Sequence, residues 1–238
     1  MTLPSSSTRF YYSAPAPCPY VPGRIERRIF ADLCGPQAAS NYEILSEAGF
    51  RRSLGFAYRP ACPGCNACVP VRIPVAAFRD TRGWRRVRAA NADLVASERP
   101  ARATTEQYAL FQRYQAARHS DGEMARMGLA DYQAMVEVGA IRSLILELRS
   151  RDGTLVGACL TDRMANGFSA VYSFYDPDQP WRSTGSFLIL TLIDMARREG
   201  LDHVYLGYWI ADSRKMAYKA RFRPLETLTR DGWRLLEP

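Results

Sequence analysis

The sequence predicts an α+β protein built around a mixed β-sheet, preceded by a small cysteine-rich α+β unit. Hydrophobic residues make up 47% and charged residues 24% of the 238 residues, which is typical of a globular protein with a buried core. Residues 18–88 are rich in Gly, Pro, Cys and Arg and have little hydrophobic periodicity. Residues 103–238 instead carry helical and strand-like patterns in turn, which indicates helices packed on a sheet.

We expect an extended segment over residues 1–17, a Cys/Arg-rich N-terminal domain over 18–102 and a C-terminal domain over 103–238. The motif T-T-E-Q at 104–107 fits a capping box and predicts the start of a helix. Residues 89–102 are interpreted as a connecting segment. The further predicted elements are a helix over 131–137, strands over 143–149 and 154–161 joined by R-D-G, a strand over 168–175, a helix over 186–198, a strand over 203–207 and a short helix over 215–221. This order resembles that of N-acyltransferases of the GNAT type.

Positive charge is concentrated in the first hundred residues. Residues 1–100 contain 14 Arg and 7 acidic residues, whereas 101–238 contain 18 Lys plus Arg and 17 acidic residues. This asymmetry favours a polyanionic partner, although a solvated basic surface gives the same composition. No apolar run approaches the roughly 18 residues that cross a bilayer, and the N-terminus lacks the apolar centre of a secretory signal. We therefore expect a cytoplasmic protein without a membrane partner, whose six cysteines are reduced.

The motif C-P-G-C-N-A-C places Cys62, Cys65 and Cys68 at successive two-residue gaps. Thiolates at this spacing can converge on one soft ion, with Cys18 or Cys34 as the fourth ligand. Zinc and an iron–sulfur cluster both fit such a ligand set. A group of small thiols in a tight turn gives the same spacing without any metal.

A second motif, R-D-T-R-G-W-R-R-V-R, gathers arginines around Trp84. Guanidinium groups beside an aromatic ring suit phosphate contacts and base stacking, which indicates a nucleic-acid surface. An exposed strand whose arginine stems cover apolar surface is the alternative. The candidate residues are Arg79, Arg82, Arg85, Arg86 and Arg88.

Two further segments carry candidate substrate-binding residues. The loop R-S-T-G-S (Arg182, Ser183, Gly185) lies between a predicted strand and a predicted helix, where backbone N–H groups can bind an anion; a plain helix cap is the alternative. Of 32 basic residues only Lys215 and Lys219 are lysines, and their spacing puts them on one helix face. A compact ammonium there suits a site too narrow for arginine.

Together these segments resemble the arginyl-tRNA–protein transferase family, and within it the bacterial aspartate/glutamate leucyltransferases. The matching motifs are C-P-Y-V-P-G-R (18–24), G-F-R-R-S (49–53), Y-R-P-A-C-P-G-C-N-A-C-V-P-V-R (58–72), Y-S-F-Y-D-P (172–177), Y-L-G-Y-W-I (205–210) and K-M-A-Y-K (215–219). The resemblance implies a cysteine-bearing N-terminal domain, a GNAT-like C-terminal domain and aminoacyl-tRNA as donor. It also implies leucyl transfer to proteins with N-terminal Asp or Glu, which marks them for degradation. The eukaryotic relatives carry two cysteine pairs, whereas this chain has Cys18 and the triplet.

For such a transfer the expected chemistry is attack of an α-amino group on an activated ester, without a required cofactor. Asp176, after the strand in F-Y-D-P, is the expected general base. Backbone N–H groups near Gly185, or the hydroxyls of Tyr175 or Tyr208, would stabilise the oxyanion. Arg182, Lys215 and Lys219 are the candidate cations for the acceptor carboxylate.

Three alternatives stay open from the sequence. Arginine is the alternative cargo, which would need an acidic pocket rather than an apolar one. An acetyl-CoA-dependent GNAT enzyme explains the order of elements but not the basic first hundred residues. A non-catalytic RNA-binding module explains the charge but leaves the second domain unused.

Overall fold

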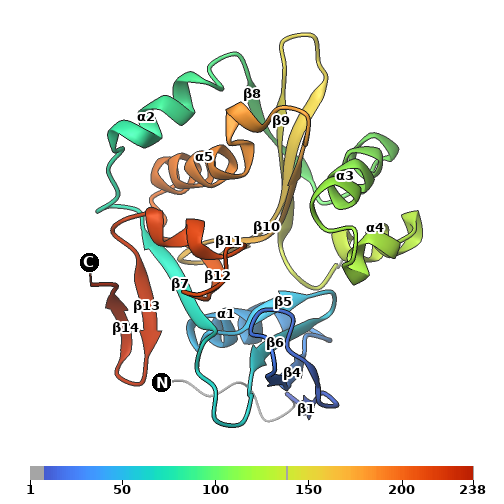
Figure 1. The fold of residues 1–238 in the computed structure, drawn as a ribbon, viewed down its shortest axis with the longest axis vertical. Helices are drawn as coiled ribbons and strands as arrows, with labels where there is room; N and C mark the ends of the chain where they lie inside the picture. The colour runs from blue at the N-terminus through green and yellow to red at the C-terminus, as the bar shows by residue number, and fades with distance from the viewer. Residues whose placement is uncertain (1–7, 138, 238) are drawn as a thin grey trace.

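The computed structural model describes residues 8–137 and 139–237, organised around an eight-stranded mixed sheet (Figure 1). The strand order is β14-β13-β7-β12-β11-β10-β9-β8. All neighbouring strands are antiparallel except β11 and β12, which are parallel. The strands are β7 (Val69–Pro74), β8 (Val95–Pro100), β9 (Ser143–Arg149), β10 (Leu155–Met164), β11 (Gly167–Tyr175), β12 (His203–Trp209), β13 (Glu226–Thr229) and β14 (Gly232–Leu235).

Helices cover both faces of this sheet, with α2 and α5 on one side and α3 and α4 on the other (Figure 1). The alternation of side chains along β9 explains why both faces are apolar. Leu144, Leu146 and Leu148 pack in the core under α5, whereas Ile145 packs in the core under α3. The helices are α2 (Arg82–Ala89), α3 (Thr105–Arg118), α4 (Leu129–Val136) and α5 (Thr184–Arg198), with 3₁₀ turns η1 (Glu123–Arg126), η2 (Pro180–Arg182) and η3 (Ala217–Arg221).

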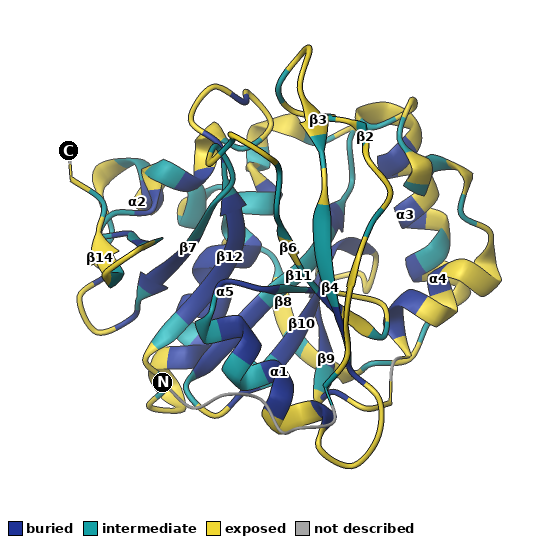
Figure 2. Cartoon of the chain, turned by 90° about the horizontal axis from the view of Figure 1, so that it is seen from below, coloured by how far each residue is buried: buried dark blue, intermediate teal, exposed yellow. Residues whose placement is uncertain are grey.

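A second, four-stranded sheet of order β1-β4-β6-β5 lies below the large one (Figure 1). Helix α1 covers one face of it and closes a third core, which includes Leu33, Tyr42 and Ala57. Figure 2 shows the strands of the large sheet largely buried, whereas the short β2–β3 pair lies at the surface. The elements are β1 (Phe10–Tyr12), β2 (Ala16–Pro17), β3 (Ile25–Glu26), β4 (Arg28–Asp32), α1 (Ala38–Glu47), β5 (Arg51–Ser53) and β6 (Phe56–Pro60).

The mixed α+β fold predicted from the sequence is confirmed. The helix at Thr104 has the predicted capping box, in which Thr104 and Gln107 satisfy each other's backbone N–H groups. The R-D-G hairpin joins β9 and β10, and the parallel strand β12 follows α5 in the order predicted for a GNAT-like domain. No helix in the described ranges is long and apolar enough to cross a membrane.

Two local interpretations were wrong. Residues 89–102 are not only a connection, because Val95–Pro100 forms the edge strand β8 beside β9. The arginine-rich segment is neither loop nor strand but helix α2, which begins after the capping residue Thr81. Strand β7, α2 and β8 therefore join or cover the large sheet although they precede residue 103; the domain division at residue 102 stays a prediction. Of the segment 1–17, residues 1–7 lie outside the described residues.

Candidate active site

The parallel strands β11 and β12 separate part-way along their length. They pair only where Gly167–Ser169 faces His203–Tyr205. Beyond that point the side chain of Arg51, from β5 of the small sheet, fills the gap: its Nη2 donates to the carbonyl oxygens of Ala170 at 2.7 Å and Val171 at 3.2 Å. The backbone of β11 is thus held by a guanidinium group from the other sheet rather than by β12.

Glycine at position 207 makes room for Arg51. Gly207 has φ +74°, and a Cβ there would lie 2.4 Å from the Arg51 Nε. Nη1 of Arg51 is buried without a hydrogen-bond partner in the described parts of the chain. A cavity of about 10 Å³, large enough for one water molecule, adjoins the group. It is lined by Ser46, Gly49, Phe50, Arg51, Pro70, Val71, Ser169, Tyr205, Gly207 and Trp233.

Tyrosine side chains line the open end of the strand gap. The rings of Tyr114 (α3) and Tyr175 (β11) have centroids 4.8 Å apart, and Gln115 donates to the Tyr172 hydroxyl at 2.5 Å. Tyr218 in η3 is 37% exposed. Burial raises the pKa of Tyr114 and raises the pKa of Tyr172 to about 12. The phenols of Tyr114 and Tyr172 therefore stay protonated near neutral pH and can donate hydrogen bonds.

Lys219 lies in η3, which contacts β12, and Lys215 lies just before it. Lys219 in η3 is buried, and its Nζ donates to the Tyr208 carbonyl oxygen at 2.6 Å. Burial lowers the pKa of Lys219 to about 7, and the positive charge of Arg51 adds to the effect. Lys215 is exposed, and its charge helps burial to lower the pKa of His119 at the end of α3. Of the sequence-predicted residues, Tyr175 packs against Tyr114, Lys219 is buried with its Nζ on the Tyr208 carbonyl oxygen, and Lys215 is exposed near His119.

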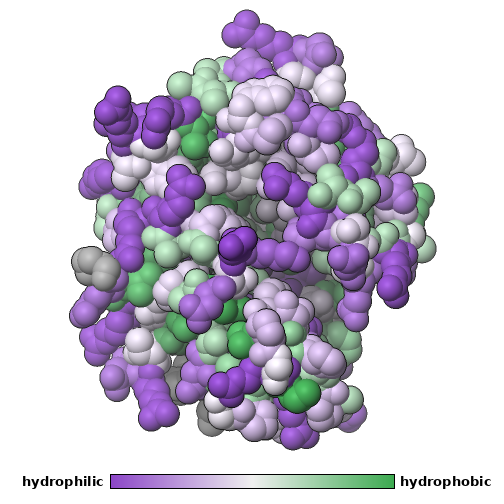
Figure 3. Space-filling view, in the orientation of Figure 1, coloured by the Kyte–Doolittle hydropathy of each residue, from purple (hydrophilic) through white to green (hydrophobic). Residues whose placement is uncertain are grey.

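The face in Figure 3 is hollowed at its centre, over the junction between the large and small sheets. Hydrophilic side chains surround this hollow, as expected for a site that admits polar substrates (Figure 3).

The predicted general base, Asp176, is engaged on both carboxylate oxygens. Its Oδ1 accepts from Arg113 at 2.8 Å and its Oδ2 from Gln179 at 2.8 Å. Gln179 in turn accepts from Arg182, whose guanidinium forms two 2.8 Å bonds to Asp93. This chain of contacts braces the loop after β11. It favours positioning roles for Asp176 and Arg182 over proton transfer and acceptor binding, because neither side chain has a free group turned to a substrate.

The loop itself enters α5 through a tight turn. Ser183 adopts the left-handed conformation with φ +53° and makes no side-chain cap. Gly185 packs on the Tyr175 ring, because a Cβ there would meet Tyr175 at 2.9 Å. Gly185 therefore sets the approach of α5 to the cleft. The predicted anion and oxyanion roles of Ser183 and Gly185 stay predictions.

Tyr208 faces away from the proposed chemistry. Its hydroxyl lies 2.9 Å from the carbonyl oxygens of both Gly49 and Tyr58. The single O–H group of Tyr208 is shared between these two acceptors. Its ring packs against that of Tyr58. This geometry corrects the prediction of an oxyanion donor: Tyr208 joins β12 to the small sheet.

The five predicted nucleic-acid arginines divide into two groups. Arg82, Arg85 and Arg86 are exposed along α2, and Arg79 is exposed just before it. Arg88 is instead paired with Asp80 and Asp194. Trp84 is 2% exposed and stacks on Phe222 at 4.3 Å, so its ring does not stack on a base as the motif suggested.

The predicted metal site at Cys18, Cys62, Cys65 and Cys68 stays a prediction. Cys68 lies near Cys18, Cys62 and Cys65, and burial together with these neighbours raises its pKa to about 11. Among the described residues no three His, Cys, Asp or Glu side chains are arranged to hold a metal ion. The metal site and the tight turn of thiols without a metal both stay predictions from the sequence.

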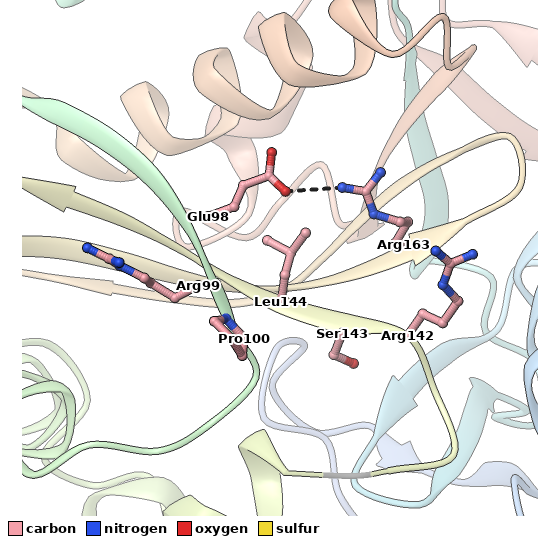
Figure 4. A pocket seen from close by; sticks show the side chains of 7 residues that line it. All are labelled: Glu98, Arg99, Pro100, Arg142, Ser143, Leu144 and Arg163. Carbon is pink, nitrogen blue, oxygen red and sulfur yellow. Dashed lines mark hydrogen bonds and ion pairs between the residues drawn. The ribbon is translucent and has the colours of Figure 1, made fainter.

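A separate surface groove lies elsewhere on the molecule. Figure 4 shows a groove of about 320 Å³ at the β8 edge, three strands away from β11. Arg163 donates to Glu98 across it at 3.1 Å, so part of its charge is neutralised. It is lined by Glu98, Arg99, Pro100, Arg142, Ser143, Leu144 and Arg163.

Sequence reasoning missed Arg51, Tyr114, His119 and Tyr218. Arg51 belongs to G-F-R-R-S and Tyr218 to K-M-A-Y-K, two of the motifs that carried the resemblance, so both could have been singled out there. Tyr114 and His119 lie in α3, whose pattern indicated only a helix.

Comparisons with known proteins agree over nearly the whole chain. Family models described as "Arginine-tRNA-protein transferase" match residues 16–86 (N terminus) and 106–229 (C terminus). The chain is 54% identical to an aspartate/glutamate leucyltransferase of Granulibacter bethesdensis, over 95% of this chain and 85% of the relative. It is 55% identical to that of Paramagnetospirillum magneticum, over 96% and 94%. The solved structure of L-PGS from Bacillus licheniformis matches with a TM-score of 0.47 and 13% identity, over 72% of this chain and 50% of that one. With both halves matched in order, the chain belongs to the arginine-tRNA-protein transferase family.

Proposed function

We propose that this protein transfers leucine from leucyl-tRNA to the N-terminal Asp or Glu of other proteins and so marks them for degradation by the N-end rule. The observation that carries this proposal is the identity of more than 50%, over nearly the full chain, with proteins named aspartate/glutamate leucyltransferase. The cytoplasm, where charged tRNA is available, is the proposed location.

The cleft between β11 and β12 suits ester aminolysis. The donor ester is already activated, so the enzyme must mainly hold the acceptor amine against its carbonyl carbon. The phenol hydroxyl of Tyr175 can donate a hydrogen bond to the developing oxyanion. Asp176 and Arg182 act by bracing the loop that carries Tyr175 into α5.

The acceptor carboxylate is assigned to Lys215. This exposed lysine lies beside His119 at the end of α3, where Arg118 adds positive charge. An Asp or Glu side chain would gain a charge-assisted hydrogen bond there. Leucine as cargo is supported by the lining of the cleft, because Arg51, Tyr114, Tyr175 and Tyr218 offer no carboxylate to a guanidinium group.

A path for the RNA leads from α2 to the cleft. Arg82, Arg85 and Arg86 supply positive charge on the exposed face of α2. Trp181 in η2 is 66% exposed and is held next to the end of this helix, because Asn91 donates to the Arg182 carbonyl oxygen at 2.7 Å. The indole ring is available to stack an unpaired base near the 3′ end, and Gly185 follows four residues later at the cleft.

Reversing the charge on α2 is expected to weaken tRNA binding. In the double variant Arg85→Glu/Arg86→Glu two phosphate contacts are lost, so the slope of log Kd against log salt should shrink by about 1 to 2. Binding of leucyl-tRNA is measured over a salt series. The variant Arg230→Glu/Arg234→Glu, which makes the same charge change on the exposed β13–β14 hairpin, is the control. Equal weakening in both variants would contradict an RNA surface on α2.

Removing the indole ring of Trp181 is expected to weaken only the binding of the single-stranded 3′ end of the tRNA. Trp181→Ala should weaken binding of leucyl-tRNA by about 5- to 150-fold, the contribution of one stacked base. Trp181→Phe should recover part of the loss. A tRNA without its unpaired 3′ nucleotides should bind wild type and Trp181→Ala alike. A loss that is equal for both RNAs would refute the stacking role.

One product analysis tests the function. The protein is incubated with a peptide bearing N-terminal Asp and, separately, leucyl-tRNA, arginyl-tRNA or acetyl-CoA, and the peptide is weighed by mass spectrometry. A leucine increment is expected. An arginine increment, an acetyl increment or an unchanged peptide would support the arginyltransferase, the acetyltransferase or the RNA-binding alternative in its place.

A further inference from the structure

We infer that Arg51 is a positioning residue for the proposed reaction. Its guanidinium group keeps β11 and β12 apart, so that the gap for the leucyl end of the RNA is open before the RNA binds. This inference rests on the proposed function, because it names the residue that prepares the donor site. Pairing of the two strands in the absence of Arg51 does not require turnover, so it can be tested on its own.

Both strands have a bulge at the point where they separate. Their last paired residues are Ser169 and Tyr205. Shortly after this pair, the register of β11 against β10 shifts, and Val171 is an extra residue without a partner. In β12, Leu206 is in the same way an extra residue against β7. A bulge bends a strand and interrupts its ladder, so the two strands diverge from this point with backbone groups left unpaired.

Arg51 supplies the hydrogen-bond donors that a continued ladder would have supplied. Its Nη2 donates to two successive carbonyl oxygens, those of Ala170 and Val171, at 2.7 and 3.2 Å. Successive carbonyl groups of a regular strand point to opposite sides, so the bulge is what turns both toward the gap. A partly buried carbonyl group without a donor costs free energy. Strand β11 therefore tolerates the separation from β12 only while the guanidinium group is present.

The neighbouring residues leave room for this side chain and direct it into the gap. Gly207 of β12 has no Cβ, and a Cβ there would lie 2.4 Å from the Arg51 Nε. Tyr58 is the cross-strand partner of Arg51 in the small sheet, so both side chains extend from the same face. The Tyr58 ring packs against that of Tyr208 in β12, with 5.9 Å between the ring centroids. The small sheet thus places a ring against β12 and a guanidinium group between β12 and β11.

Arginine suits this position better than the other cationic residues. Its guanidinium group is planar and carries five N–H donors, so it can serve several backbone acceptors at once. It also stays charged at physiological pH, so these donors are not lost by deprotonation. Nη1 of Arg51 has no hydrogen-bond partner in the described parts of the chain, and the adjoining cavity has space for one water molecule. The hydrogen bonds that the guanidinium group makes to described residues thus both go to β11.

Without Arg51 we expect β11 and β12 to approach each other. The backbone N–H groups of β12 after Tyr205 would then be the available donors for the carbonyl oxygens of Ala170 and Val171, because the pairing of the strands ends at that residue. Pairing would narrow the gap, so only the fraction of molecules with separated strands could admit the leucyl group. The apparent affinity for that group falls in proportion to this fraction.

Hydrogen exchange measures the approach of the strands directly. In Arg51→Ala, the β12 amides of residues 206–209 that are not bonded to β7 should exchange about 10-fold more slowly than in wild type, because they gain β11 as a partner. A protein that is merely destabilised would exchange faster instead. Arg59→Ala removes an exposed arginine from the neighbouring strand β6 and is the control, which should leave the exchange of β12 unchanged.

Binding provides the second test. The RNA carries leucine through a stable amide, and the same RNA without leucine is the reference. Leucine should strengthen binding to wild type. In Arg51→Ala this gain should shrink by about 10-fold or more, while the RNA without leucine binds within about twofold of wild type. Arg59→Ala should keep the gain. An equal loss for both RNAs would assign Arg51 to general RNA binding and overturn its role in the gap.

Addition of a small cation separates the effect of the guanidinium group from that of the fold. Methylguanidinium can occupy the space left in Arg51→Ala and should restore both the leucine-dependent binding and the faster exchange of the β12 amides. Arg51→Lys, whose compact ammonium group does not reproduce the planar fork, should recover only part of the binding. Melting curves establish that the variants are folded.

The possible results separate this inference from the proposed function. Unchanged exchange of the β12 amides in Arg51→Ala, or leucine-dependent binding equal to that of wild type, would overturn the inference alone. A wild-type protein that transfers no leucine would overturn the proposed function and the donor role of the gap. Slower exchange in Arg51→Ala would still establish that Arg51 separates the strands.

Discussion

Replacing Gly207 with alanine is expected to lower kcat/KM for leucyl transfer by about 100-fold or more. The added Cβ would lie 2.4 Å from Nε and 2.5 Å from Cζ of Arg51, so the guanidinium group must move. Arg51 donates hydrogen bonds to the β11 carbonyl oxygens of Ala170 and Val171. Its charge also acts on Lys219. A displacement of about 1 Å would therefore change the position of strand β11 beside the gap. Steady-state kinetics with leucyl-tRNA measure the loss.

The chain offers a matched control for backbone strain. Gly200, after α5, has φ +68°, close to the +74° of Gly207, but a Cβ there would meet nothing within 4 Å. Gly200→Ala carries the same left-handed strain without the clash and should keep activity within a few-fold. If Gly207→Ala and Gly200→Ala are equally active, the position of the Arg51 side chain between β11 and β12 has no part in leucyl transfer.

The largest effect on stability is expected at the ion pair between the two sheets. Arg52 of β5 donates to both oxygens of Asp162 of β10 at 2.7 and 2.8 Å, and both side chains are fully buried. Ser143 also donates to Asp162 at 2.7 Å. Asp162→Asn leaves the guanidinium charge buried without a counter-ion, which should lower the free energy of unfolding by about 3 to 5 kcal/mol. Denaturant titration measures the loss.

An exposed pair serves as the comparison. Asp178, 76% exposed, also accepts from an arginine, Arg113. Asp178→Asn should cost at most about 1 kcal/mol, because water screens the pair. The double variant Arg52→Met/Asp162→Leu removes both charges and should recover part of the stability lost in Asp162→Asn. Equal losses in the free energy of unfolding for Asp162→Asn and Asp178→Asn would contradict the stabilising role of the buried Arg52–Asp162 pair.

Elements whose signal is local could be predicted from the sequence. The capping box at Thr104, the R-D-G turn and the apolar run of α5 each specify a structure within a few residues. Strand β8 was missed because an edge strand exposes most of its side chains, and V-A-S-E-R-P has no apolar alternation. Helix α2 was missed because one buried residue, Trp84, holds it to the core, which leaves no helical stripe.

The site was predicted only in part, because the sequence again reveals only signals that lie within a few neighbouring residues. The segment 205–219 identified Lys215 and Lys219, because two lysines stand out among thirty arginines. The partner of Asp176 is Arg113, 63 positions earlier, and Arg51 meets Val171 across 120 positions. Such pairings arise from the packing of the two sheets, so a motif such as F-Y-D-P suggested a free carboxylate where the fold has an engaged one.

The most direct test of the account is a structure of the protein with leucyl-RNA whose ester is replaced by a stable amide. The account predicts that the RNA crosses α2 and Trp181 and that the leucyl carbonyl carbon lies at the open end of the β11–β12 gap, next to Tyr175. A leucyl group bound in the groove at the β8 edge, or anywhere remote from Arg51 and Tyr175, would contradict it.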